Sequence, residues 1–140
     1  MSNVREMRRH DARILALSAL FCWELSKDTP AESFDLVAAG YFDSGARADF
    51  AKEIFLAAVD NAGEIDGLIA KASQGWALHR MPRVDLSILR LAIAEALYLK
   101  KTPNIDEAVE LSKEFSTHAS PRFVNGVLVA ILRGFGNVPE

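Results

Sequence analysis

The sequence lacks the features that mark disulfide-bonded, secreted and membrane-spanning proteins. It contains one cysteine, Cys22, so no intrachain disulfide can form, and its first residues lack the apolar run of a secretory signal. No apolar stretch reaches the roughly 18 residues of a membrane span. The chain has 140 residues, of which 50% are hydrophobic and 25% charged, a globular composition. We therefore expect a cytoplasmic protein without membrane segments.

Patterns typical of catalysis and of metal binding are also missing. The three histidines, His10, His79 and His118, share no ligand spacing, and Cys22 lies in an apolar run that suppresses thiol reactivity. The Gly-Phe-Gly of residues 134–136 follows a predicted helix, so it cannot be a dinucleotide-binding loop. The sequence predicts no catalytic residue, no metal site and no cofactor.

Helical periodicity is present instead. Apolar residues recur at spacings of three and four, without the sustained alternation of a strand. The pattern predicts helices over about 4–26, 31–41, 47–62 and 64–76, and three more that begin near Asp85, Asn104 and Ser120. A connector over 78–83 separates an N-terminal bundle of about 1–78 from a C-terminal bundle of about 82–136. We expect one all-α domain over 1–140, with about seven helices in two packed bundles.

The net charge of −3 is unevenly distributed along the chain. Residues 1–13 carry four arginines and two acids, and residues 24–66 carry three basic and ten acidic side chains. Residues 67–140 carry nine basic and seven acidic side chains. Because a local basic patch is enough to hold phosphates, the negative total does not exclude binding to nucleic acid.

The arginines near the start are the sharpest candidate site. On a helix they would cover an arc of about 140°, opposite the apolar stripe. Guanidinium groups bind phosphates bidentately and stack on bases, although Asp11 partly cancels the field here. The alternative, of equal weight, is an ordinary solvated helical face. The arginines are Arg5, Arg8, Arg9 and Arg13.

A second candidate cluster begins the last predicted helix at Ser120. A helix N-terminus exposes N–H groups that favour anions, and Arg122 adds positive charge there. Phe123 or Asn125 could contact a base. The alternative is that Ser120 only caps the helix and Phe123 lies in the core. Gly126 costs about 1 kcal/mol relative to alanine inside a helix, which favours close approach of another helix.

These residues lie in blocks that resemble one known family, the bacterial transcription antitermination factor NusB. The start of the chain, with Arg8, Arg9 and Arg13 followed by residues 19–26, looks like the first helix of that family. Residues 27–75 match only in character. The most specific blocks are Val84–Ala92, Ile105–Lys113 and Phe123–Leu128.

The resemblance implies a non-catalytic helical protein of two packed bundles. It implies binding to boxA RNA together with ribosomal protein NusE, in an RNA polymerase antitermination complex that supports ribosomal RNA transcription. Phe21 and Asp85 resemble contacts to the partner, and we expect Asp85 to be exposed at or near the N-cap of its helix. The implied RNA contacts are Arg8, Arg9, Arg13, Ser120, Arg122, Phe123 and Asn125, with Arg5 in the same run.

The sequence departs from the family pattern at several of these places. His10 and Asp11 stand where basic residues are common, which weakens the grip on phosphate. Phe21 replaces a usual tyrosine and so loses a hydroxyl group. Ala119 stands where an acid is frequent, and this removes a negative charge beside the second cluster. Asp106 replaces a usual asparagine.

Two other functions remain open on the sequence. One is a NusB-like structural or interaction module without RNA specificity of its own. The other is a helix-turn-helix DNA binder, which would need a basic recognition helix. The last helix offers only Arg122 and Arg133 for that purpose. The oligomeric state, monomer or homodimer, is also open.

Overall fold

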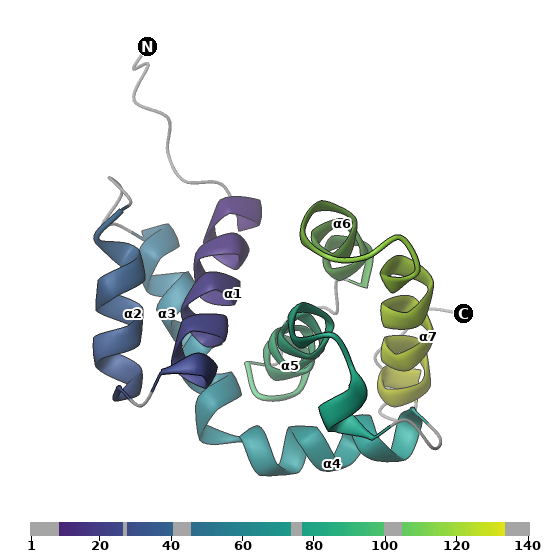
Figure 1. Ribbon diagram of the computed structural model, residues 1–140. Helices are drawn as coiled ribbons and strands as arrows, with labels where there is room; N and C mark the ends of the chain where they lie inside the picture. The colour runs from purple at the N-terminus through teal and green to yellow at the C-terminus, as the bar shows by residue number, and fades with distance from the viewer. Residues whose placement is uncertain (1–8, 27, 41–45, 74–76, 100–104, 134–140) are drawn as a thin grey trace. The chain divides into compact units, whose positions relative to one another are not determined.

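The computed structural model describes residues 9–26, 28–40, 46–73, 77–99 and 105–133 (Figure 1). Over these ranges the chain forms seven α-helices and one short 3-10 helix, without a strand. The prediction of an all-α fold with about seven helices is therefore confirmed. None of the helices in these ranges is long and apolar enough to cross a membrane.

The first of two compact units comprises residues 1–56. It holds α1 (Arg9–Leu25), α2 (Pro30–Ala38) and most of α3 (Ala46–Asp60), with α1 packed on α2. Phe34 and Phe55 bring their rings together with centroids 5.6 Å apart in the core of this unit. The buried face of α1 consists of Ala12, Leu15, Ala16, Leu17, Ala19 and Leu20.

A capping box that the sequence analysis did not single out begins α2. The Thr29 hydroxyl accepts a hydrogen bond from the Glu32 backbone N–H at 3.2 Å, and the Thr29 backbone N–H donates to Glu32 Oε1 at 3.0 Å. Pro30 occupies the first helical position, where its missing N–H has no cost. The Thr-Pro-Ala-Glu sequence is the pattern that predicts this start.

The second unit comprises residues 57–140 and is built around α5 (Arg83–Leu97). The helices α4 (Ala62–Ala72), α6 (Ile105–Phe115) and α7 (Ser120–Arg133) all pack against it. Figure 1 shows α5 nearly end-on, with these three helices around it. The 3-10 helix η1 (Leu78–Arg80) joins α4 to α5. Ten of the 15 residues of α5 are buried, which makes it the centre of the unit.

The division between the units falls inside α3, whereas the sequence predicts a boundary at the connector over 78–83. The physical reason is α4, which packs on α5 and α7. Arg90 on α5 reinforces this packing, because it donates from Nε and Nη2 to the Asp66 carboxylate at 2.7 and 2.8 Å. Burial raises the pKa of Asp66 and lowers the pKa of Arg90. The assignment of one domain over 1–140 stays a prediction.

Candidate nucleic-acid interface

Two of the four arginines near the start of the chain lie on the first turns of α1. Arg9 is exposed and Arg13 is half-buried, whereas Arg5 and Arg8 fall outside the described residues. Arg9 Cζ lies 4.8 Å and Arg13 Cζ lies 5.6 Å from the centroid of the Phe50 ring. Both distances are within cation–π range. The two side chains therefore converge on one aromatic group.

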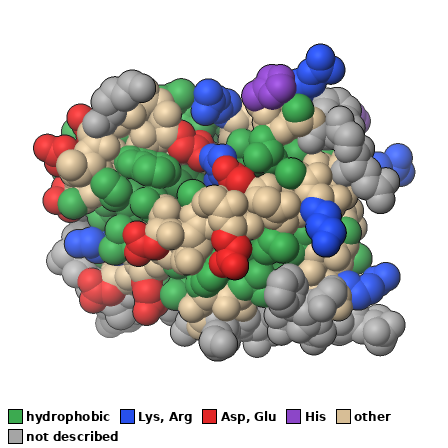
Figure 2. All heavy atoms as spheres, turned by 90° about the horizontal axis from the view of Figure 1, so that it is seen from below, with side chains coloured by type: hydrophobic (Ala, Val, Ile, Leu, Met, Phe, Trp, Pro, Cys, Tyr) green, Lys and Arg blue, Asp and Glu red, His purple; other side chains and the backbone are tan. Residues whose placement is uncertain are grey.

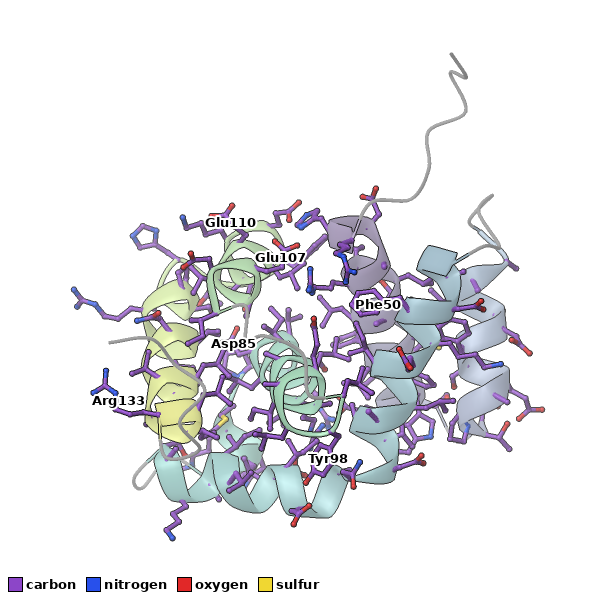
Figure 3. The ribbon with its side chains drawn as sticks, turned by 180° about the vertical axis from the view of Figure 1, so that it is seen from behind. Phe50, Asp85, Tyr98, Glu107, Glu110 and Arg133 are labelled. Carbon is purple, nitrogen blue, oxygen red and sulfur yellow. The ribbon has the colours of Figure 1, made fainter. Side chains whose placement is uncertain are left out.

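Phe50 belongs to α3 and is only 9% exposed (Figure 3). Figure 3 shows it beside the start of α1. Its link to the arginines could not be predicted from the sequence, because Phe50 fits simply into the apolar face of its helix. No spacing rule connects it with residues some forty positions earlier; only the packing of α3 near α1 does so.

The second predicted cluster divides between surface and interior. Arg122 and Asn125 on α7 are exposed, and Phe123 is half-buried. Gly126 is exposed, and a Cβ added there would meet nothing within 4 Å. The prediction that another helix approaches Gly126 is therefore wrong. The exposed part of the cluster is polar and carries one positive charge.

Asp85 differs most from the sequence prediction. It was expected to be exposed at or near the helix N-cap, but it is 2% exposed, and Pro82 occupies the N-cap of α5. The reason is that the junction between α6 and α7 covers the first turn of α5. Ser116 Oγ donates to Asp85 Oδ1, and Ser120 Oγ donates to Asp85 Oδ2 at 2.8 Å. In Figure 3, Asp85 lies between α5 and α7.

Ser120 is part of the same buried network and is 1% exposed. Besides donating to Asp85, its hydroxyl oxygen accepts a hydrogen bond from the Thr117 backbone N–H at 3.2 Å. Its single proton is used on the carboxylate, so a direct hydrogen bond from Ser120 to RNA would require the network to open. The RNA contact of Ser120 stays a prediction, and the side chain demonstrably links α7 to α5.

A mainly apolar pocket of about 210 Å³ lies where these segments of the second unit meet. It brings Asp85 together with Ser120 and Phe123, which belong to the second candidate cluster. It also includes Met81, Pro82 and Thr117, to which the sequence assigns no binding role because they read as ordinary connector residues. The full lining is Met81, Pro82, Asp85, Thr117, Ala119, Ser120 and Phe123.

In the view of Figure 2, acidic and basic side chains lie on the same face among hydrophobic ones. Phe21, the other predicted partner contact, is half-buried on α1. Within the described ranges, no three potential metal ligands come together.

These features define an all-helical protein with an arginine pair over an aromatic ring in the first unit and an exposed polar stretch at the start of α7 in the second. The family model described as the NusB family matches residues 10–133. The chain belongs to the NusB family.

Named relatives agree with this membership. A transcription antitermination protein NusB from Herpetosiphon aurantiacus is 43% identical over 142 residues, which cover 94% of this chain and 92% of the relative. The NusB of Desulforamulus reducens is 38% identical over 129 residues, 90% of each chain. A solved structure of the antitermination factors NusB and NusE in complex with dsRNA matches with a TM-score of 0.83 and 31% identity. That match covers 90% of this chain and 96% of the other.

Proposed function

We propose that this protein is a transcription antitermination factor that binds boxA RNA together with ribosomal protein NusE. It would act in the RNA polymerase antitermination complex and support ribosomal RNA transcription. The observation that carries the proposal is the likeness, over nearly its whole length, to a NusB solved with NusE and double-stranded RNA. The proposed role is binding, without catalysis or cofactor, in the cytoplasm.

Each of the two proposed RNA-binding clusters, one in each unit, contains accessible side chains. Arg9 on α1 and Arg122 on α7 are exposed, so each can reach a phosphate, and Asn125 beside Arg122 can hydrogen-bond to a base. Half-buried Phe123 can present the edge of its ring. Arg5, Arg8 and Arg13 complete the proposed set of phosphate contacts.

The proposed contact with NusE involves Phe21 and, indirectly, Asp85. Since Asp85 is buried, its contribution would be to hold Ser116 and Ser120, and with them the shape of the pocket at the start of α7. Phe21 is half-buried, so part of its ring can meet a partner directly.

The test is RNA affinity measured by fluorescence anisotropy, with and without NusE, on boxA RNA and a scrambled RNA. Each phosphate contact contributes about −0.7 to the slope of the logarithm of affinity plotted against the logarithm of salt concentration. The five candidate arginines therefore predict a slope of about −3.5. Arg9→Ala combined with Arg13→Ala should lower affinity most at low salt and leave helical content unchanged. A slope near zero, or equal affinity for the scrambled RNA, would contradict the proposal.

A matched control removes the same charge elsewhere. Lys71 on α4 and Lys113 on α6 are exposed, and Lys113 makes only a surface ion pair with Glu110 at 3.1 Å. Replacing both lysines with alanine should leave RNA affinity nearly unchanged if the arginines form a specific surface. An equal loss in both double variants would mean that only net charge matters, as expected of a module without RNA specificity of its own.

A further inference from the structure

We propose that Phe50 is a positioning residue for RNA binding, whose ring holds Arg9 and Arg13 as a ready-made pair that grips one stretch of RNA backbone. The inference rests on the proposed function, and in particular on the part that α1 plays in it. It adds a residue of α3 that has no charge and no polar group to the proposed RNA surface.

The geometry places two like charges at one ring. Arg9 and Arg13 are four residues apart on α1, so they project from the same face of the helix. Their Cζ atoms lie 4.8 and 5.6 Å from the Phe50 centroid. The guanidinium groups repel each other, and the negative face of the ring partly offsets that repulsion. A phosphate that contacts both groups would offset the repulsion further.

Stacking also prepares the arginines for binding. A free arginine side chain populates many rotamers, and fixing it on a ligand costs conformational entropy. The Phe50 ring is 9% exposed, so its own position is fixed by the packing of α3. Contact with this fixed ring restricts both arginine side chains before RNA binds. A guanidinium group stacked on a ring keeps the N–H donors at its edge available for phosphate.

The surroundings of Phe50 provide a conservative variant. Phe50 lines a hollow of about 410 Å³ together with Asp49, Lys52, Glu53 and Leu56. Phe50→Tyr keeps an aromatic face under the arginines. Phe50→Leu keeps apolar bulk but removes that face.

Phe34 supplies the matched control. It is 5% exposed, packs against Phe55 with tilted rings and has the Lys52 ammonium 5.9 Å from its ring centroid, so Phe34→Leu also removes a buried aromatic ring from the first unit. The Phe34→Leu substitution leaves the contacts of Phe50 with the two arginines unchanged. Both leucine variants should lower thermal stability, which separates a general loss of packing from a loss of positioning.

The experiment measures anisotropy of a fluorescein-labelled single-stranded boxA RNA with NusE present, at low salt, on variants whose circular dichroism matches the wild type. Phe50→Leu should weaken binding by about three- to tenfold, the effect expected of lost cation–π contacts. Phe50→Tyr and Phe34→Leu should stay within about twofold of the wild type.

A double-mutant cycle then tests the route of the effect. In the Arg9→Ala, Arg13→Ala background, Phe50→Leu should have no further effect on affinity. An equal loss with and without the arginines, or equal losses for Phe50→Leu and Phe34→Leu, would overturn the positioning role and leave the proposed function standing. If the double arginine variant binds like the wild type, both the α1 surface and the role of Phe50 are wrong.

Discussion

Replacing Asp85 should destabilise the protein far more than replacing an ordinary first-turn aspartate. Both carboxylate oxygens accept hydrogen bonds from serine hydroxyl groups, and the side chain is 2% exposed. Hydrogen bonds to a charged group contribute about 1.5–3 kcal/mol each. Asp85→Ala should therefore lower the free energy of unfolding by about 3–5 kcal/mol, a large part of the 5–15 kcal/mol typical of a folded domain.

Replacing the two serine partners of Asp85 one at a time should lower the free energy of unfolding by unequal amounts. Ser120 is 1% exposed, so Ser120→Ala leaves Asp85 Oδ2 without a donor and should cost about 2–3 kcal/mol. Ser116 is half-buried, so water can replace its hydroxyl group, and Ser116→Ala should cost about 1 kcal/mol. Asp85→Ala and Ser120→Ala should be coupled by at least about 1 kcal/mol in a double-mutant cycle.

The assay is urea denaturation followed by far-ultraviolet circular dichroism, with the slope of free energy against urea compared between variants. Asp106 provides the control, since it is an exposed aspartate in the first turn of α6. Asp106→Ala should cost only a few tenths of a kcal/mol, the scale of a charge near a helix N-terminus. The reasoning is refuted if Asp85→Ala and Asp106→Ala are equally stable, or if the Asp85–Ser120 coupling is absent.

Three other features of the structure have measurable consequences. Thr29→Ala should cost about 1 kcal/mol, measured by thermal denaturation. Since hydrogen bonds from Thr29 lower the pKa of Glu32, the stability from this capping box should be present above the ordinary glutamate pKa and lost as pH falls through the lowered value. Burial, and then the hydrogen bond to Glu64, raise the pKa of Tyr98 to about 12, so Glu64→Gln should lower the titration midpoint of the tyrosinate absorbance. Gly126→Ala should raise the free energy of unfolding by about 0.5–1 kcal/mol, since the added methyl meets open space, and an unchanged or lower melting temperature would contradict this.

The helices could be predicted from the sequence because their signals are local. Apolar spacing and proline or glycine breaks locate all seven α-helices of the described ranges, and their bounds differ from the predicted ones by only a few residues at most ends. The grouping of the helices into two units was harder to predict from the sequence. The packing of α4 on α5 and α7 depends on long-range contacts, including the one between Asp66 and Arg90, for which neither sequence neighbourhood carries a signal.

The surroundings of Asp85 and Phe50 in the candidate sites could not be predicted from neighbouring residues in the sequence. Asp85 three residues after Pro82 looks like a helix-start aspartate, and at that level exposure is the natural expectation. Its burial is decided by Ser116 and Ser120, more than thirty residues later, whose hydroxyl groups satisfy both oxygens and so make burial of a carboxylate tolerable. Phe50 follows the same logic, because only the fold brings its ring beneath two arginines. In both cases the residue type was visible in the sequence, and its chemistry depends on a partner that arrives through tertiary packing.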